Sequence, residues 1–342
     1  MSDQDFHGKP ARVGFLGVGW IGRHRMEAMI ASGLVEAVAL ADPSSQMLLA
    51  ASKAAPRARH FRSLEELLAE DLDGVVIATP SSQHSEQSVH ALRAGIPVFC
   101  QKPLGRNREE VIAVVDAAKA VDRLLSVDLS YRHTQAMRRI KDLMNAQELG
   151  TITAVDLTFH NAYGPDKPWF YDRRLSGGGC VIDLGVHLID LALWALDFPE
   201  VVTVESHLMS QGQPITRIAE EVEDFAAATL QLASGSVVRL ACSWRLNAGC
   251  DCVIDASFYG TQGGAAMRNV NGSFFDFIAE RFSGTTSQRL VDPPDEWGGR
   301  AAISWAKRLC EGKGFDPAAE RLIAVADVID RIYTSPRAEK VS

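Results

Sequence analysis

Short apolar runs alternate with amphipathic stretches over the first 130 residues of the chain. The apolar runs are rich in aliphatic and β-branched residues, as buried parallel strands are. They span residues 12–16, 37–41, 74–78, 98–100 and 124–128. The stretches between them include predicted helices at residues 85–94 and 108–120. Strands that alternate with helices are typical of a parallel sheet joined by crossover helices, so this half of the chain is predicted to be an α/β domain.

The pattern changes after Gly150, where longer runs alternate apolar and polar residues. These predicted strands span residues 151–160, 201–207, 224–232 and 236–244. A turn signal, Ala233-Ser234-Gly235, joins the last two, as expected of an antiparallel pair. At about 150 residues per domain, 342 residues correspond to two domains. We expect an α/β domain over residues 1–130 and an α+β domain with a mostly antiparallel sheet over residues 131–342, with the last helix, residues 317–333, free to pack back on the first domain.

A glycine-rich segment, Gly17-Val18-Gly19-Trp20-Ile21-Gly22, follows the first predicted strand and opens a helix. In this context glycines let a pyrophosphate approach the backbone N–H groups at a helix N-terminus. Asp42 follows Gly22 by 20 residues, at the end of the second strand, where a carboxylate can bind the ribose of a dinucleotide. The two features together predict a dinucleotide site. The Asp42 charge would repel the 2′-phosphate of NADP, so NAD is the preferred cofactor, without NADP being excluded.

Two further segments follow predicted strands and should emerge at the same edge of the sheet. Thr79 and Pro80 follow the third strand, where they either contact the cofactor or simply cap a turn. Gln101 and Lys102 follow the fourth strand. The Lys102 ammonium could donate a hydrogen bond to a substrate oxygen, although an ordinary surface lysine is the alternative.

The run Gly177-Gly178-Gly179 leads into a predicted helix that carries Asp183, His187 and Asp190. Their spacing places the three polar side chains on one helix face. A carboxylate one turn from an imidazole can orient it and stabilise its protonated form, as a general base requires. The glycines are interpreted as clearing space for a nicotinamide or a sugar. The set lacks the histidine-rich spacing of zinc sites, so no metal is predicted.

Composition excludes several other classes of protein. The 35 Lys and Arg residues against 43 Asp and Glu give a net charge of −8, without a basic run that could follow a nucleic-acid backbone. The opening segment carries two aspartates and no apolar core, so no signal peptide is expected. No apolar stretch reaches the length of a membrane span without a charge. We therefore expect a cytoplasmic protein that binds neither nucleic acid nor membrane.

Across nearly its whole length, the chain resembles the Gfo/Idh/MocA oxidoreductase family, which includes glucose–fructose oxidoreductase and inositol 2-dehydrogenase. The markers are the glycine-rich segment, Asp42, the stretch from Ala78 to His84, the stretch from Ala94 to Pro103 and the run at 177–190. The resemblance implies that Lys102, Asp183 and His187 form the catalytic trio. The predicted cofactor contacts are Gly17, Gly19, Trp20, Ile21, Gly22, Asp42, Thr79, Pro80, His84, Gln101 and Lys102. The predicted substrate contacts are Lys102, Arg132, Trp169, Arg173, Asp183 and His187.

The resemblance implies NAD(P)-dependent hydride transfer at a carbinol of a sugar, inositol or related polyol, in a homo-oligomer such as a dimer or tetramer. Gln101 departs from the family, which commonly has Glu before this lysine. Two alternatives stay open. One is a non-catalytic regulator that binds a dinucleotide and a sugar. The other is a glycosidase that uses NAD for a transient oxidation, which would turn over without net NADH.

Overall fold

The chain divides into two compact units in the computed structural model, which describes residues 9–217 and 220–334. Among the described residues, the first unit comprises residues 9–105, 109–130 and 298–322. The second comprises residues 106–108, 131–217, 220–297 and 323–334. After Ser130 the chain passes into the second unit, returns to the first at Gly298 and enters the second again at Ile323.

The first unit contains a six-stranded sheet with the order β3-β2-β1-β4-β5-β6, and all its strand pairs are parallel. The strands are β1 (Ala11–Leu16), β2 (Val35–Ala41), β3 (Arg59–Phe61), β4 (Gly74–Ile77), β5 (Val98–Cys100) and β6 (Leu125–Val127). The strand order reverses between β1 and β4. In open parallel sheets of this kind, ligands bind beyond the carboxyl ends of the strands at such a reversal.

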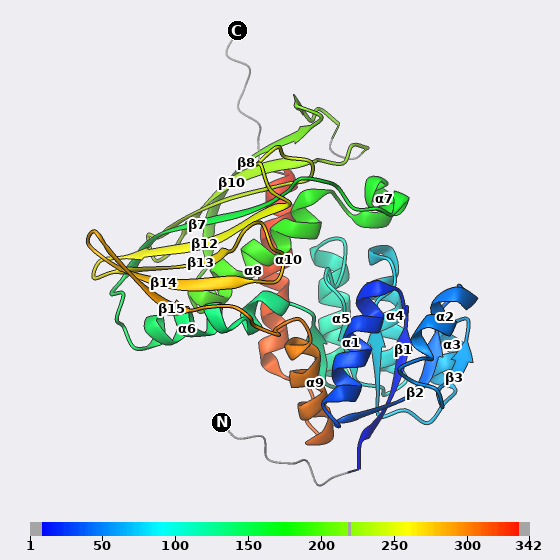
Figure 1. Cartoon of the computed structure of the whole chain (residues 1–342). Coiled ribbons are helices and arrows are strands. Elements are labelled where there is room, and N and C mark those ends of the chain that lie inside the picture. The colour runs from blue at the N-terminus through cyan, green and yellow to red at the C-terminus, as the bar shows by residue number, and fades with distance from the viewer. Residues whose placement is uncertain (1–8, 218–219, 335–342) are drawn as a thin grey trace. The chain divides into compact units, whose positions relative to one another are not determined.

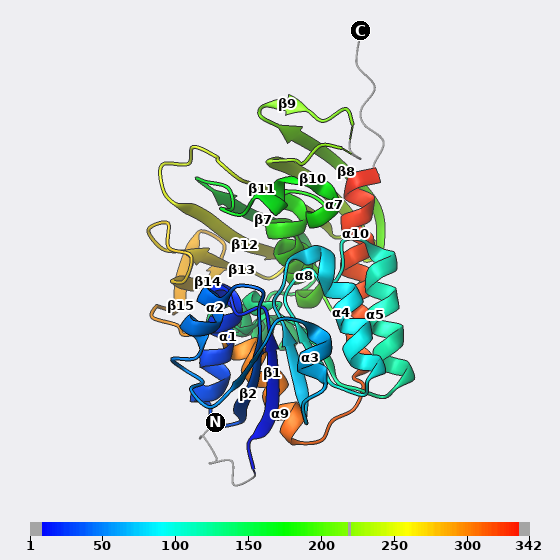
Figure 2. The same cartoon turned by 90° about the vertical axis from the view of Figure 1, so that its right-hand side faces the viewer.

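Helices cover both faces of this sheet (Figure 1, Figure 2). They are α1 (Trp20–Ala31), α2 (Ser45–Ala51), α3 (Leu64–Leu68), α4 (Ser81–Arg93), α5 (Arg108–Ala120) and α9 (Arg300–Cys310). Alternation along β1 explains the two layers. Phe15 is buried in a core with residues of α1 and α9, whereas a Cβ on neighbouring Gly14 would touch Leu67 of α3. Successive strand residues thus point to opposite faces.

The C-terminal helices differ from the expected division. Helix α9 belongs to the first unit because Trp305, with Ala301, Ala302 and Ala306, packs into the core that contains Met26 of α1. The last helix, α10 (Arg321–Thr334), follows a short 3₁₀ turn at Pro317–Glu320. Most of α10 belongs to the second unit, where its buried residues Val325, Val328, Ile329, Ile332 and Tyr333 join that unit's core. The helix that returns to the first unit is α9, which was not predicted from the sequence.

The second unit contains a nine-stranded, mostly antiparallel sheet with the order β15-β14-β13-β12-β7-β11-β10-β8-β9. The strands are β7 (Ile152–Asn161), β8 (Val201–Ser210), β9 (Gln213–Pro214), β10 (Phe225–Leu232), β11 (Val237–Ser243), β12 (Cys252–Gly260), β13 (Gly264–Asn269), β14 (Phe277–Ser283) and β15 (Thr286–Val291). One pair, β7 with β11, is parallel. The fold class predicted from the sequence is therefore confirmed.

One face of this sheet packs against α6 (Gln135–Asn145), α8 (Val186–Ala195) and α10. Its inward residues include Val155, Leu157 and Phe159 of β7. The helical stretch Arg173–Ala195 is long and apolar enough to cross a membrane, but 83% of its most apolar window is buried inside the protein. That extent of burial is typical of a core helix.

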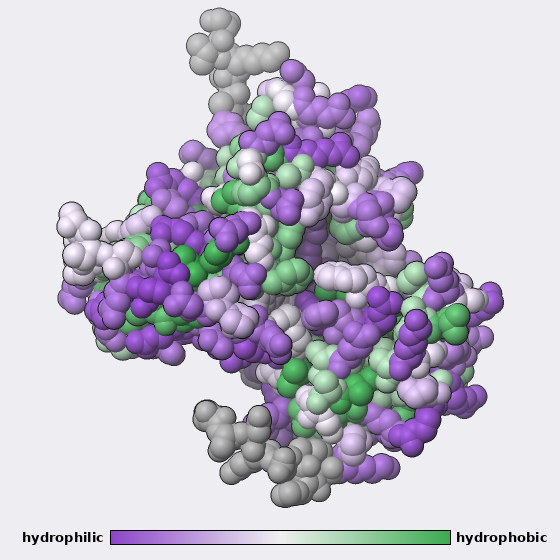
Figure 3. Space-filling model, viewed as in Figure 1, coloured by the Kyte–Doolittle hydropathy of each residue, from purple (hydrophilic) through white to green (hydrophobic). Residues whose placement is uncertain are grey.

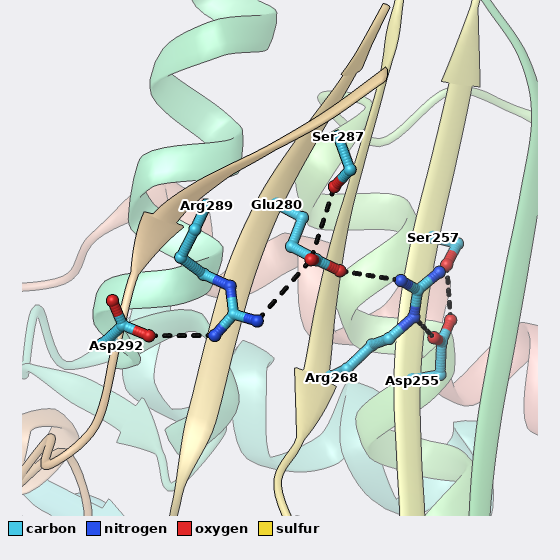
Figure 4. Close-up of polar contacts among 7 residues, drawn as sticks. All are labelled: Asp255, Ser257, Arg268, Glu280, Ser287, Arg289 and Asp292. Carbon is cyan, nitrogen blue, oxygen red and sulfur yellow. Dashed lines mark hydrogen bonds and ion pairs between the residues drawn. The ribbon is translucent and has the colours of Figure 1, made fainter. Parts of the chain in front are cut away.

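Ion pairs cover part of the opposite face of the same sheet. Arg268 of β13 pairs with Asp255 of β12 and with Glu280 of β14, and Glu280 also faces Arg289 of β15 (Figure 4). Charges of opposite sign on adjacent strands stabilise the pairing of those strands. In the view of Figure 3 the surface is mostly hydrophilic, and hydrophobic residues are scattered over it in small groups.

Candidate active site

The predicted site residues fall into two groups, one in each unit. The first group lies at the carboxyl edge of the parallel sheet. The glycine-rich segment follows β1, Asp42 follows β2, Thr79 follows β4 and Gln101 follows β5. The carboxyl ends of parallel strands meet at one edge, so the sheet brings these residues together as predicted.

Each glycine of the glycine-rich segment has its own structural reason. Gly17 has φ +80°, and a Cβ there would lie 2.6 Å from the backbone of Ala78. A Cβ on Gly22 would overlap the carbonyl oxygen of Gly17. Beside Gly19, in contrast, a Cβ would meet no atom within 4 Å. Gly17 and Gly22 are thus required for packing, while Gly19 leaves open space at the N-terminus of α1. Backbone N–H groups at such a helix end suit a pyrophosphate.

The carboxylate of Asp42 holds the glycine-rich segment through a hydrogen bond. Its Oδ2 accepts a hydrogen bond from the Val18 N–H at 3.0 Å, and its Oδ1 accepts one from the Ser44 N–H at 2.9 Å. The residue is only 8% exposed. Trp20, at the first position of α1, is 65% exposed. The loop, its helix and Asp42 therefore fit the phosphates and adenosine ribose of a dinucleotide.

Two buried side chains hold the turn that carries Lys102. The Gln101 side-chain amide donates to Asp128 Oδ2 at 2.5 Å. The His84 ring nitrogens lie 2.7 Å from the Pro103 carbonyl oxygen and 2.6 Å from that of Thr79. His84 was predicted as a cofactor contact. In the structure its ring ties the segment after β4 to the segment after β5, and burial lowers its pKa, opposed by these two hydrogen bonds.

The second group surrounds the run Gly177-Gly178-Gly179. The interpretation that these glycines clear space for a ligand is wrong, because protein atoms fill that space. A Cβ on Gly178 would overlap the Tyr333 hydroxyl, and one on Gly179 would overlap the Glu223 carbonyl oxygen. Gly177, with φ +87°, lies against Arg106. The glycines are needed so that the chain can pack closely at this point.

Glu223 anchors the start of the helical segment. Its Oε1 accepts hydrogen bonds from the Gly179 N–H at 2.9 Å, the Val181 N–H at 3.0 Å and the Tyr333 hydroxyl at 2.8 Å. Its Oε2 has no hydrogen-bond partner among the described residues and lies 4.0 Å from Nη1 of Arg173. Burial raises the pKa of Glu223, although the hydrogen bonds from Val181 and Tyr333 and the charge of Arg173 oppose that rise.

The helix that carries Asp183 and His187 is not regular throughout. A π-helical turn at Val181–Gly185 precedes α8, and such turns are frequent at functional sites. Asp183 lies in the π-helical turn, where its Oδ2 accepts a hydrogen bond from the Trp244 indole N–H at 3.1 Å. His187 lies in the first turn of α8, is 8% exposed, and packs edge to face against Tyr131 with ring centroids 4.9 Å apart.

The remaining substrate candidates have partners within the second unit. Arg132 forms an ion pair with buried Asp190, so Asp190 has a structural role, and burial raises its pKa against the effect of Arg132. The guanidinium of Arg173 lies 4.2 Å from the centre of the Tyr333 ring. Trp169 stacks on Phe170 with ring centroids 3.8 Å apart. Trp169 therefore belongs to an aromatic group with Phe170, Tyr171 and Trp244.

Three residues that shape the site were not identified from the sequence: Asp128, Glu223 and Trp244. Asp128 had a signal, since it is a polar residue at the carboxyl end of a predicted strand. Glu223 lies 44 residues from its partner Gly179 and Trp244 lies 61 residues from its partner Asp183, so only the fold brings each pair together. Among residues 9–217 and 220–334, no group of His, Cys, Asp or Glu is placed to hold a metal ion.

Replacing Glu223 should change how stability depends on pH. Because burial raises its pKa, the folded chain keeps this proton to a higher pH than the unfolded chain, whose value is near 4.5. The resulting stability is present below that value and is lost as the pH rises through the folded pKa. Glu223→Gln keeps an acceptor oxygen without the charge, so the free energy of unfolding should vary less with pH. Urea denaturation from about pH 4 to about pH 8 measures this.

Glu223→Ala is the matched comparison. It leaves the three donors without their acceptor, which should lower the free energy of unfolding by about 3 kcal/mol. The same pH dependence in Glu223→Gln and the unchanged protein would show that Glu223 is not the titrating group.

Two segments of the chain match family models, and parts of its sequence are similar to known dehydrogenases. Residues 11–129 match the family model described as an oxidoreductase family with an NAD-binding Rossmann fold, and residues 137–266 match the Gfo/Idh/MocA C-terminal domain. The chain is 29% identical to D-glucoside 3-dehydrogenase of Escherichia coli (strain K12) over 59% of this chain and 60% of that protein. It is 31% identical to inositol 2-dehydrogenase of Leifsonia xyli subsp. xyli over 57% of this chain and 56% of that protein. Each match thus spans less than two thirds of the relative.

A solved structure shares the fold over almost the full length. Levoglucosan dehydrogenase in complex with NADH and L-sorbose superimposes with a TM-score of 0.82 at 21% identity, covering 96% of this chain and 97% of that chain. The two matching family models, together with the order of the motifs from Gly17 to His187, establish the relationship. The chain therefore belongs to the Gfo/Idh/MocA family of oxidoreductases.

Proposed function

We propose that the protein is an NAD(P)-dependent dehydrogenase that acts on a carbinol of a sugar, inositol or related polyol. The observation that carries this proposal is the open space at Gly19 beside the N-terminus of α1, braced by Asp42. When bound there, a nicotinamide dinucleotide supplies the hydride acceptor or donor.

The proposed roles of the side chains follow from their chemistry. Lys102 donates a hydrogen bond to the reacting oxygen and stabilises negative charge on it. His187 takes the hydroxyl proton during oxidation and returns it during reduction. Asp183 orients the substrate hydroxyls, and the hydrogen bond from Trp244 fixes its carboxylate. The internal contacts of Arg132 and Arg173 support only a secondary role in substrate binding.

A sugar or polyol substrate is favoured by the aromatic group around Asp183. Trp169, Phe170 and Tyr171 form a ring cluster with buried Trp244, whose indole N–H donates to the Asp183 carboxylate. Such a combination suits a molecule with both C–H faces and hydroxyl groups. The names of the relatives, a glucoside dehydrogenase and an inositol dehydrogenase, point to the same class.

A panel of aldoses, glycosides, inositols and linear polyols tests the proposal, with NAD or NADP and nicotinamide absorbance as the signal. We expect net NADH formation with at least one cyclic polyol or sugar. Release of a leaving group without net NADH would identify the glycosidase alternative. Ligand binding without turnover of any kind would identify the regulator.

The cofactor preference is a separate prediction. The Asp42 carboxylate favours a ribose with free hydroxyls and repels a 2′-phosphate, so kcat/KM should be higher with NAD than with NADP. Replacing Asp42 by Ser and Pro43 by Arg should reverse this order. Asp42→Asn is the matched control, because it removes the charge while keeping an acceptor oxygen for one of the two N–H groups, of Val18 and Ser44, that Asp42 binds. Unchanged preference in all these variants would show that Asp42 does not select the cofactor.

The oligomer and the location of the protein remain predictions from the sequence. Size-exclusion chromatography with light scattering would measure the first, for which we expect a dimer or tetramer. A cytoplasmic location is the expectation for the second.

A further inference from the structure

Asp128 is a buried carboxylate on which three side chains of the first unit converge. Its side chain is 1% exposed. Its Oδ2 accepts from Arg25 Nε at 2.6 Å and from Gln101 Nε2 at 2.5 Å, and its Oδ1 accepts from the Ser130 hydroxyl at 2.5 Å. A carboxylate buried this deeply is tolerated only when an opposite charge and hydrogen bonds compensate it, and all of these contacts are present.

The contacts of Asp128 join two parts of the first unit, the helix of the proposed phosphate site and the turn that carries Lys102. Arg25 lies on α1, the helix whose N-terminus forms the proposed phosphate site. Gln101 immediately precedes Lys102, and Asp128 itself follows β6. Arg25 also donates to Ser130 at 3.1 Å and lies 2.9 Å from Nδ1 of His24, so its guanidinium has three polar contacts. Asp128 thereby links the helix of the glycine-rich segment to the turn of Lys102.

The identity of residue 101 follows from this arrangement. A carboxylate accepts hydrogen bonds and donates none. The residue at position 101 must therefore supply an N–H to Asp128, as Gln101 does. A glutamate at position 101 would place two carboxylates in contact at this point. Gln101 and Asp128 therefore form a matched pair, with one amide and one carboxylate.

We propose that Asp128 is a positioning residue for Lys102, acting through its contact with Gln101. It holds the side chain of Gln101 and so fixes the backbone from which Lys102 projects. Arg25 neutralises the buried charge and ties the same point to α1. The importance of Lys102 rests on the proposed function, whereas the pairing of Gln101 with Asp128 stands on the contacts themselves.

A double-mutant cycle tests the proposal with Gln101→Glu, Asp128→Asn and the combination of both. Gln101→Glu should lower kcat by about 10-fold to 100-fold, because a catalytic group displaced by a fraction of an ångström loses activity on this scale. Asp128→Asn keeps the shape but leaves the Arg25 charge unneutralised, and should also lower kcat. The double variant again has one amide and one carboxylate in contact. It should recover most of the kcat that Gln101→Glu loses, so the two effects should not add.

Two further readouts do not depend on turnover. The melting temperature of the protein without cofactor and its affinity for NADH, followed by fluorescence, should both show the same recovery in the double variant. Val114→Ala is the control, since it removes buried volume from α5 away from this network. It should lower the melting temperature while leaving kcat unchanged.

The possible outcomes separate the two proposals. Absence of turnover in the unchanged protein on the full substrate panel would refute the proposed function, and the cycle in melting temperature and NADH affinity would still measure the pairing. Normal turnover in Gln101→Glu, or effects that simply add in the double variant, would overturn the role of Asp128.

Discussion

Replacing Lys102 by Ala is expected to lower kcat by about 100-fold or more while leaving NADH affinity nearly unchanged. The turn that carries Lys102 is held on both sides, by Gln101 on Asp128 and by His84 on the Pro103 carbonyl. Both supports remain when only the Lys102 side chain is shortened. The variant should therefore lose the donor to the reacting oxygen without losing the local fold.

Steady-state kinetics and NADH fluorescence titration on the same preparation separate these two effects. Lys119→Ala is the matched control, because Lys119 is an exposed lysine of the same unit that pairs with Glu320. It should behave like the unchanged protein in both assays. Near-normal turnover in Lys102→Ala would remove Lys102 from the mechanism, and a large loss of NADH affinity would reassign it to cofactor binding.

Most of the first sheet could be predicted from the sequence because its strands are buried on both faces. Strands were predicted at residues 12–16, which are apolar after Arg12, and at the apolar residues 98–100, and the structure has β1 at Ala11–Leu16 and β5 at Val98–Cys100. The short strand β3 was not predicted. Its residues Arg59 and His60 are exposed, so it lacks the apolar pattern that identifies its neighbours.

The second sheet was predicted only over its first half. Strands β7, β8, β10 and β11 alternate apolar and polar residues, and each was expected within a few residues of its observed bounds. Strands β13 and β15 lack that alternation. β13 is built largely from small residues, and β15 carries mostly exposed polar ones. Their place in the sheet is set by pairing with β12 and β14 and by the charges around Arg268 (Figure 4).

For the candidate site, the sequence identified the glycines and polar side chains but not the distant residues that contact them. The roles of Gly19 and Gly22 follow from a strand–turn–helix context that is local in sequence, whereas Gly17 is also required by the distant backbone of Ala78. The roles of Gly178 and Gly179 depend on Tyr333 and Glu223, which lie far away along the chain. A glycine needed for close packing has the same sequence signal as a glycine that admits a ligand. Only the position of the distant residues distinguishes the two.

Replacing His187 by Asn should lower kcat/KM for oxidation by about 100-fold to 10,000-fold. The reason is chemical, because asparagine has a similar size and can form hydrogen bonds but cannot accept a proton at neutral pH. His187 is 8% exposed and packs against the edge of Tyr131, so a residue of similar size should preserve the local packing. Kinetics as a function of pH, with NAD and the best substrate of the panel, measure the effect.

The dependence on pH identifies the role of His187 more sharply than the loss of rate. In the unchanged protein, oxidation should become faster as the pH rises, since only a neutral imidazole can accept the hydroxyl proton. In His187→Asn this rise should disappear, whereas in His207→Asn, an exposed histidine of β8, it should persist. Added imidazole should restore part of the activity of His187→Gly by supplying the missing base. A rise with pH that survives in His187→Asn would assign proton transfer to another group. Lys102 would then be the first candidate, because it is the other group proposed to contact the reacting oxygen.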